Sequence, residues 1–427
     1  MRSIVRGLAL FIASGAVLGG AAAGTSVPTL RVPEDFASIQ AAVDSLGRGG
    51  IVEVGAGTYG PVRLGTDVES GISIVNVTIR GATDAVIDGG AEPAISVLSA
   101  RDVVVDGFTV VSQDAGVSVS HGENVEVRNV TVAAAGTDGI RVEAVTDVSV
   151  TGNRIESAGG TGISVNAGTA ETYGPLVVRD NTVVSAGGDA ILVHNIGDGA
   201  KVVVSGNTVE SATGRGIRTE CGMTLQLSHN DVHSTGGAGI SVDRVVDTTN
   251  VTQNTVTDAG GAGVEFTYGV SVVIANNRID GTAGDGVAGS LAASAEIRAN
   301  SVTDAGDAGV RIVNIDPVTV ASNEVVDPTG TGIVLEEVNR GAVQGNTVAE
   351  PGVHGVELDA TDRVRVIGNV VTGAEDCGFR LENGAGGNVL KRNKALECAQ
   401  GLWVEDGLRK RNRIARSNRF GRRHAPR

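Results

Sequence analysis

A short unit, in which an asparagine is followed two positions later by Val or Ile, recurs along this chain and constrains its fold more than any other feature. Most gaps between successive asparagines are 23 or 24 residues. A period of this length predicts stacked structural repeats rather than ordinary globular domains. The series comprises Asn153, Asn181, Asn207, Asn230, Asn254, Asn277, Asn300, Asn323, Asn346, Asn369, Asn393 and Asn418, and Asn129 and Asp106 continue its spacing upstream.

The residues of one repeat predict three short strands separated by tight turns. In the repeat around Asn207 the strands are residues 202–204, 208–210 and 217–220, and glycines occupy the turns. Strands this short cannot bury a core alone, but stacked coils align them in parallel about 4.8 Å apart. Crossovers between parallel strands are right-handed in about 98% of cases, so we expect a right-handed coil.

The predicted fold is all-β: a single-stranded, right-handed parallel β-helix of about 13 coils of about 23 residues, over residues 51–407. Val and Ile side chains would form inward columns, and the asparagines would stack and pair their amides along one turn. The composition agrees, because 63 glycines suit many turns while aromatic residues make up only 2% of the chain.

The two ends differ from the repeats. Residues 1–23 have the pattern of a cleaved secretory signal, with Arg2 and Arg6 before an apolar stretch too short to span a bilayer. Residues 24–50 predict an N-terminal cap with an amphipathic helix, and residues 408–427 form a basic C-terminal cap or tail. No later segment is long and apolar enough to cross a membrane, so we expect a secreted protein in the extracellular space, the periplasm or on the cell surface.

The sequence resembles the pectin-lyase-like right-handed parallel β-helix superfamily. The resemblance lies in residues 36–44 and 51–59, which look like that superfamily's cap and first strand, and in the repeats themselves. It implies the fold and an extracellular polysaccharide role, since the superfamily includes lyases, glycoside hydrolases, esterases, epimerases, copper-delivery accessory proteins and phage tailspikes. The sharper catalytic signatures of these enzymes are missing; for example, the single tryptophan, Trp403, is not followed by the Asp-His of pectate lyases.

Charge and composition limit the kinds of partner that the sequence supports. The net charge of −15 argues against nucleic acid as a partner. Two Met and six His in the whole chain give little support to a metal-delivery role. Cys377 and Cys398 lie about one repeat apart, so they either pair across neighbouring coils or remain thiols, and Cys221 is left over.

Candidate site residues come from the third strand of each repeat, where side chains alternate between the core and the outside. The outward positions place His194, Glu220 and Asp243 in one column, with Arg218 beside them. A histidine or arginine beside paired carboxylates suits acid–base chemistry, so these four are the predicted catalytic residues. The two longest repeats put their extra residues near His194, at about 167–174 and 195–200, and insertions in solenoids usually mark the binding face.

Further outward residues are predicted to bind substrate: Arg141, Glu143, Tyr173, Glu265 and Tyr268. A second acidic group could bind a divalent cation such as Ca²⁺, or could simply be a solvated surface; it comprises Glu336, Glu357, Asp359 and Glu382. No metal ligand is assigned among the predicted catalytic residues.

The sequence therefore predicts a secreted protein that acts on extracellular polysaccharide, most simply as a lyase. Arg218 or Arg141 would neutralise a uronate carboxylate, His194 would be the base, and Tyr173 or Glu220 the acid. Glu220 and Asp243 could instead form a hydrolase pair. The alternative is a non-catalytic glycan-binding or cell-surface scaffold protein.

Overall fold

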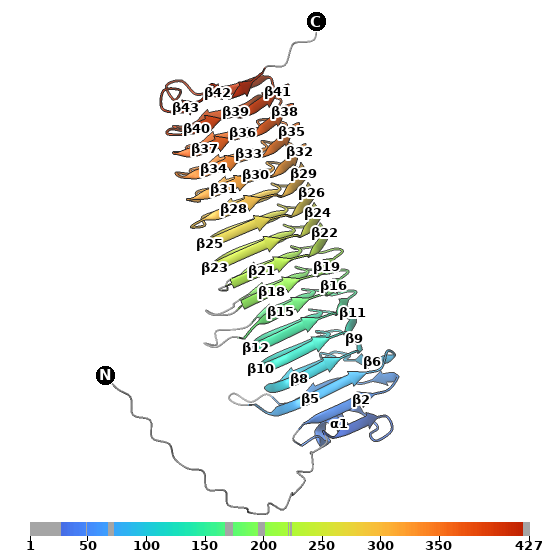
Figure 1. The fold of residues 1–427 in the computed structure, drawn as a ribbon. Coiled ribbons are helices and arrows are strands. Elements are labelled where there is room, and N and C mark those ends of the chain that lie inside the picture. The colour runs from blue at the N-terminus through green and yellow to red at the C-terminus, as the bar shows by residue number, and fades with distance from the viewer. Residues whose placement is uncertain are drawn as a thin grey trace, which may run out of the picture.

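A computed structural model describes residues 27–47, 49–66, 72–166, 174–194, 201–220, 222 and 224–421. These residues form one elongated stack of coils that runs from α1 and β2 at the N-terminal end to β42 and β43 at the C-terminal end (Figure 1). Neighbouring coils pair through parallel strands along the stack. The predicted right-handed parallel β-helix with one short helix is confirmed.

The strands of the described residues belong to two sheets. The smaller one has 16 strands, one per coil, and holds the second strand of each repeat: β3 (Gly57–Tyr59), β6 (Ala85–Asp88), β9 (Thr109–Ser112), β11 (Thr131–Ala135), β13 (Arg154–Ile155), β16 (Thr182–Val183), β19 (Thr208–Val209), β22 (Asp231–Thr235), β24 (Thr255–Ala259), β26 (Arg278–Thr282), β29 (Ser301–Ala305), β32 (Glu324–Val326), β35 (Thr347–Ala349), β38 (Val370–Thr372), β41 (Lys394–Leu396) and β44 (Arg419–Phe420).

The larger sheet has 28 strands and combines the first and third strands of the repeats. In four coils a third strand continues into the first strand of the next repeat, and the two form one long strand. It comprises β1 (Thr29–Val32), β2 (Gly50–Val54), β4 (Val62–Leu64), β5 (Ile74–Gly81), β7 (Ile95–Leu98), β8 (Ala100–Asp106), β10 (Val117–Arg128), β12 (Ile140–Thr151), β14 (Ile163–Asn166), β15 (Leu176–Arg179), β17 (Ile191–His194), β18 (Lys201–Ser205), β20 (Ile217–Glu220), β21 (Thr224–Ser228), β23 (Ile240–Thr252), β25 (Val264–Ala275), β27 (Val287–Ser290), β28 (Ala295–Arg298), β30 (Val310–Val313), β31 (Val318–Ala321), β33 (Ile333–Glu336), β34 (Gly341–Gln344), β36 (Val356–Asp359), β37 (Val364–Ile367), β39 (Cys377–Glu382), β40 (Val389–Lys391), β42 (Gln400–Val404) and β43 (Arg413–Ile414).

The N-terminal cap contains the helix α1 (Ile39–Ser45). Ser38 caps it by accepting a hydrogen bond on Oγ from the backbone N–H of Ala41, at 3.2 Å. The helix buries Ile39, Ala42 and Val43 against the first coil. Strand β1 precedes it and pairs with β2, so the cap also contributes a strand that the sequence pattern did not predict.

The core consists of the inward Val and Ile columns that the repeat predicts. Val204, Val209 and Ile217, one from each strand of a single repeat, are completely buried. Their equivalents in the other coils continue the columns along the stack. Each such side chain contributes roughly 1.5–3 kcal/mol when it leaves water.

The predicted asparagine ladder is confirmed from Asn153 to Asn418. The Asn207 backbone N–H donates to Oδ1 of Asn230 at 3.1 Å, and its Nδ2 donates to the same oxygen at 2.9 Å. Nδ2 also donates to the carbonyl of Val178 in the preceding coil, at 3.0 Å. The pattern repeats coil after coil, so these buried amides keep their hydrogen bonds.

Upstream of Asn153 the ladder differs from the prediction. The Val130 N–H donates to Oδ1 of Asn153 at 2.9 Å, so Val130 and not Asn129 occupies the ladder position. Asn129 is exposed in a left-handed conformation, and its Nδ2 donates to Asp106 at 2.8 Å. The N-terminal coils therefore lack the asparagine by which coils were counted, and the number of coils is 16 rather than 13.

A glycine precedes most third strands because neighbouring coils approach closely there. A Cβ added to Gly309 would lie 2.2 Å from Cγ1 of Val325 and 2.7 Å from the carbonyl oxygen of Gly332. Gly332 meets its own next coil in the same way. These contacts leave no room for a side chain, which explains the recurrent glycine.

At the C-terminal end, β43 and β44 lie within the basic segment, and the Phe420 ring packs on Phe379 with centroids 5.4 Å apart. Cys377 and Cys398 are both buried and are not joined by a disulfide, which decides the alternative left open by the sequence. Cys221 and the predicted signal, residues 1–23, lie outside the described residues. Within the described part of the chain, α1 is far too short and polar to serve as a membrane span, and no other helix qualifies.

Candidate functional site

The outward side chains of the third strands form one polar strip, which we call the third-strand face. Two columns run along it, and the strand register sets their members. One column passes through Leu192, Arg218, Ser241 and Glu265, and farther on through Glu357, Arg380 and Trp403. Charged residues gather at two places on this face, one near the middle and one toward the C-terminal end.

The middle group contains most of the predicted catalytic residues. Glu220 of β20 is paired in register with Asp243 of β23. His194 ends β17, which pairs with β20 so that His194 precedes Glu220 in the same column. The structure therefore brings these three predicted residues onto adjacent coils, with Arg218 beside Glu220.

Ion pairs neutralise this middle group, which we call the central cluster: Arg215, Arg218, Glu220, Asp243 and Glu265. Arg218 bonds to Glu220, and Nη1 lies 3.7 Å from Oδ2 of Asp189 on the preceding coil. Arg215 Nε lies 3.1 Å from Oε1 of Glu265. These residues line a depression of about 350 Å³. Its walls are polar but nearly balanced in charge, which suits binding more than strong acid–base chemistry.

Other predicted residues lie elsewhere. Arg141 is three coils before Arg218 and is held by Asp138, at 3.0 Å, and by Asp114, at 3.3 Å. Glu143 follows it on the same strand and is exposed. Tyr173 lies outside the described residues, as do residues 167–173 and 195–200, which follow third strands as the repeat predicted.

The second group, which we call the C-terminal cluster, comprises His354, Glu357, Arg380, Glu382 and Trp403. Arg380 connects them: Nε donates to Glu382 at 2.9 Å and lies 3.8 Å from Glu357. Its guanidinium carbon lies 5.0 Å from the centroid of the Trp403 ring. His354 is only 2% exposed, and its Nε2 lies 2.6 Å from Nη1 of Arg380.

The two carboxyl groups of this cluster differ in protonation. Burial, together with the hydrogen bond to Glu382 and the charge of that residue, raises the pKa of Glu357 to about 7. Burial also opposes ionisation of Glu382, but the hydrogen bonds from Glu357 and Arg380 outweigh it and lower the pKa of Glu382. Burial and the nearby Arg380 charge lower the pKa of His354, so that this imidazole is neutral.

The cation site predicted from Glu336, Glu357, Asp359 and Glu382 is not assembled. Glu336, Asp359 and Glu382 follow one another in one column, but no three of the four bring ligand oxygens together in the described structure. Arg380 lies beside both Glu357 and Glu382 and supplies the positive charge. The guanidinium therefore occupies the place expected for a cation.

One set of three potential metal ligands does come together among the described residues: His354, Asp376 and Cys377, with ligand atoms within 4.8 Å of one another. The Cys377 Sγ–H donates to Asp376 at 3.3 Å. Burial, with that hydrogen bond and the Asp376 charge, raises the pKa of the Cys377 thiol to about 12. A metal ion bound here would have to displace the thiol proton.

Sequence reasoning placed Glu357, Arg380 and Glu382 on the outward face but missed His354 and Trp403. His354 lies before the third strand rather than on an outward position of it, so the in–out alternation did not select it. Trp403 lies in the same outward column as Arg380, in a coil beyond those inspected. Extending the column by one repeat would have placed the single tryptophan beside Arg380.

Two family profiles match the chain. Residues 65–232 and 195–279 match the profile described as "Right handed beta helix region". Residues 271–422 match the profile "Periplasmic copper-binding protein (NosD)". No curated protein matches the chain.

Among solved structures, the A-module of the mannuronan C-5 epimerase AlgE6 of Azotobacter vinelandii is similar, at 17% identity and a TM-score of 0.40, over 91% of this chain and 95% of that one. The family 28 exopolygalacturonase of Yersinia enterocolitica gives 14% identity and a TM-score of 0.40, over 79% and 78%. A PL6 alginate lyase bound to a trisaccharide gives 12% and 0.39, over 81% and 85%. At these values no residue role is transferred from them.

Proposed function

Because this chain belongs to the right-handed β-helix family and carries two groups of charged residues along its third-strand face, we propose that it is a carbohydrate-active enzyme that acts on an extracellular polysaccharide lying along this face. The observation that carries this proposal is the C-terminal cluster. There a carboxyl group that keeps its proton near neutral pH, Glu357, is hydrogen-bonded to an ionised one, Glu382. Such a split between two neighbouring carboxyl groups is typical of acid–base sites.

The residues of the cluster have complementary roles in this proposal. Glu357 is the proton donor, and Thr331 holds its carboxyl group through a hydrogen bond from Oγ1 to Oε2, at 3.3 Å. Glu382 is the proton acceptor. Trp403 is half-buried and offers an apolar ring surface beside Arg380 on which a sugar ring can stack.

The close approach of the two carboxyl groups favours elimination over hydrolysis. Two-carboxylate glycosidases keep these groups roughly 5–9.5 Å apart to leave space for the sugar carbon or a water molecule. Here the groups are hydrogen-bonded. In the proposed elimination Glu382 takes the C5 proton of a uronate, the C4–O bond breaks as a C4–C5 double bond forms, and Glu357 protonates the departing oxygen. The Arg380 charge stabilises the negative charge that develops on the uronate.

For the central cluster we propose binding of the same polysaccharide. Its arginines are already paired with carboxylates, and a sugar hydroxyl or carboxylate can exchange with these partners. The catalytic assignment of His194, Arg218, Glu220 and Asp243 stays a prediction that the same assay tests.

The assay measures the ultraviolet absorbance of the unsaturated uronate product and, separately, new reducing ends, over a panel of uronic-acid polysaccharides. Glu357→Gln removes the proton donor and keeps the side chain's shape; Glu336→Gln, on the same face, is the matched control. We expect unsaturated product with wild type and Glu336→Gln, and none with Glu357→Gln. Reducing ends without unsaturated product would show hydrolysis, and no product from any polysaccharide would reject the enzyme proposal in favour of a glycan-binding scaffold.

A second candidate function, metal binding, is favoured by one observation: His354, Asp376 and Cys377 lie together inside the segment that matches the copper-binding profile. Thiolate and imidazole are suitable ligands for Cu(I). Titration with Cu(I) against a chromophoric chelator tests it, with Cys377→Ser as the variant and Cys398→Ser as the control. Equal copper uptake by all three proteins would exclude this site.

We also propose export across the inner or plasma membrane, with residues 1–23 removed. N-terminal sequencing of the protein recovered outside the cytoplasm tests this. A mature chain that starts near residue 24 supports export, and recovery of the intact chain from the cytoplasm alone contradicts it.

A further inference from the structure

One corner of the coil places a residue in the left-handed backbone conformation on successive repeats. From β10 onward it directly follows the third-strand part of the coil, and its side chain is exposed. φ is close to +50° throughout, between 50° and 57°. The residues at this corner are His121, Ala144, Arg244, Tyr268, Leu291, Asn314, Glu337, Ala360 and Asn383.

Two of these corner residues are large and apolar, although the fold gives no reason for it. A left-handed conformation is strained for an L-residue other than Gly, and Asn tolerates it best. Tyr268 and Leu291 nevertheless occupy it, and they are 55% and 42% exposed. They gain little from burial to offset the strain, which points to a functional reason for their presence.

The apolar character extends beyond the corner itself. Val246 and Val270, at the next turn of the chain, are 51% and 48% exposed. With Tyr268 and Leu291 they make up four of the nine exposed large hydrophobic residues in the described part of the chain. Scattered exposed apolar residues are ordinary, but a contiguous group of them marks a binding surface.

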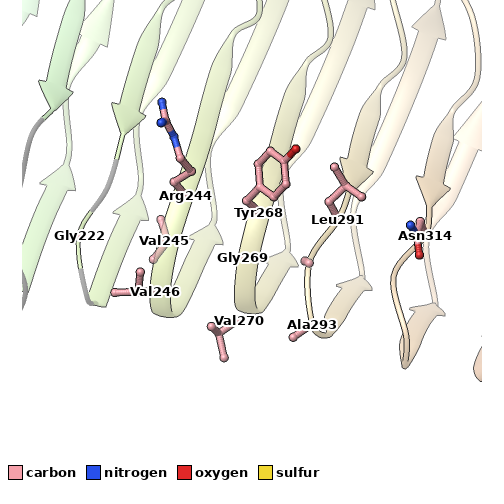
Figure 2. Close-up of a pocket in the computed structure, with 11 residues that line it drawn as sticks. Gly222, Arg244, Val245, Val246, Tyr268, Gly269, Val270, Leu291, Ala293 and Asn314 are labelled. Carbon is pink, nitrogen blue, oxygen red and sulfur yellow. The ribbon is translucent and has the colours of Figure 1, made fainter.

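These side chains line a pocket of about 830 Å³. Figure 2 shows Arg244, Tyr268, Leu291 and Asn314 following one another on successive coils, with the smaller residues of the pocket at the bend beside them. The lining is mostly aliphatic: Val245, Val246, Val270, Leu291, Ala292 and Ala293. Apart from the Tyr268 hydroxyl, its polar side chains are Arg244 and Asn314.

The apolar pocket is continuous with the depression of the central cluster. Tyr268 lines both. Arg244 also contributes to the apolar pocket, while its Nε donates to Asp243 of the central cluster at 3.0 Å. A polar, charge-balanced compartment and an aliphatic compartment therefore meet at one tyrosine ring.

We propose that this pair of compartments binds an alkyl- or acyl-substituted saccharide, with the sugar in the depression of the central cluster and the aliphatic group in the pocket beside Tyr268 and Leu291. The aliphatic walls offer few hydrogen-bond donors to sugar hydroxyls, so a second sugar unit would leave its hydroxyls unpaired there. The arginines of the central cluster are paired with carboxylates. These side chains can therefore form hydrogen bonds to a neutral sugar without leaving an unpaired charge buried. The site lies several coils from the C-terminal cluster, so this inference rests on the sugar binding proposed for the central cluster but not on the proposed reaction.

The test compares octyl glucoside, below its micelle concentration, with methyl glucoside by isothermal titration calorimetry on the full chain. Burial of the octyl group predicts at least about tenfold tighter binding for wild type. Leu291→Asn removes the apolar wall and places at the corner the residue that best tolerates its backbone. We expect it to abolish most of the octyl preference while the melting temperature stays equal or rises. Glu337→Asn makes the same change at the same corner two coils away, and it should leave the octyl preference intact.

Three results would overturn the proposal. Equal binding of octyl and methyl glucoside would show that the pocket takes no alkyl group. Equal binding of octanoate and octyl glucoside would show that the depression does not recognise sugar. If sedimentation showed wild type to be a dimer that Leu291→Asn converts to monomer, the pocket would be covered by a second copy. None of these results bears on the assay for elimination, so failure of either proposal is recognised separately.

Discussion

Glu357 and Glu382 lie on adjacent coils, and Arg380 lies beside both carboxyl groups. The arginine donates to Glu382 at 2.9 Å but lies 3.8 Å from Glu357, so the ionised form is favoured at Glu382. Thr331 and burial hold Glu357 as the partner that keeps the proton. This unequal environment moves the pKa values of two identical side chains in opposite directions.

Replacement of Glu357 by Gln should lower turnover by about 10²–10⁴-fold, the usual contribution of a general acid. The Michaelis constant should change little, because the amide keeps the shape and the contact with Thr331. Initial rates over a range of polysaccharide concentrations measure both quantities. Retention of more than half the wild-type turnover would remove Glu357 from the reaction.

The pH dependence of turnover should follow the same proton. Because burial raises the pKa of Glu357 to about 7, the donor is lost as the pH rises through that value, and the rate should fall tenfold per pH unit above it. The falling limb should be absent from the residual activity of Glu357→Gln. A rate that stays constant from pH 6 to pH 9 would contradict the assignment; these two pH values bracket the pKa of about 7.

The pH dependence of folding stability due to Glu357 should have the opposite sign from that due to an ordinary salt-bridged carboxylate, whose pKa is lowered by folding. The folded-state pKa of Glu357 is raised from 4.5 to about 7, so between these values the unfolded chain releases a proton that the folded chain retains. The free energy of unfolding should therefore fall as the pH rises through this range, by about 3 kcal/mol at most. Urea denaturation at several pH values measures it, and Glu357→Gln should flatten this part of the curve. The lowered pKa of Glu382 acts in the other direction, but only at more acidic pH.

Removal of one ladder asparagine should destabilise the solenoid strongly. Asn277→Ala leaves the backbone N–H and Nδ2 of Asn254 without their shared acceptor, and it removes the donors to Val251 and Asn300. Each buried group left unpaired costs about 1–3 kcal/mol, so a total of 3 kcal/mol or more is expected. Asn250→Ala, on the partly exposed face of β23, is the control and should cost under about 1 kcal/mol. Equal denaturation midpoints for the two variants would show that the asparagine ladder does not stabilise the fold.

Arg218→Ala should weaken substrate binding more than it slows the reaction. The side chain lies in the central cluster between Glu220 and Asp189, away from the C-terminal cluster. We expect the Michaelis constant to rise about tenfold, the size of one charge-assisted hydrogen bond, with turnover within about twofold of wild type. Arg298→Ala, which breaks an exposed ion pair on β28, is the control. A fall in turnover with an unchanged Michaelis constant would instead support catalysis by the central cluster.

The repeat alone was enough to predict the fold, because inward Val and Ile columns and the asparagine ladder leave one way to stack the coils. It also placed Glu220 beside Asp243, since the register follows directly from the spacing. The sequence placed the upstream ladder position at Asn129, but the structure places it one residue later, at Val130. Both positions fit the spacing, and only the hydrogen bond from the Val130 N–H to Asn153 distinguishes them.

The C-terminal cluster was harder to predict for a different reason. Its properties come from depth and contact rather than from periodicity. His354 reaches Arg380 from a turn, and the raised pKa of Glu357 depends on how far its carboxyl group is buried. Column membership says which residues are neighbours on the surface, but not which of them exclude water.

The asparagine ladder is also closed at both ends. The Val130 N–H donates a hydrogen bond to the first asparagine, Asn153. The last one, Asn418, donates to the carbonyls of Leu390 and Ala415. Every member between them sees the same partners, so a whole coil can be duplicated or lost by recombination without leaving an amide unpaired. A one-residue insertion in a strand would instead turn its apolar side chains outward. The length of the third-strand face is thus free to evolve in steps of one coil, while the spacing within each coil is held fixed.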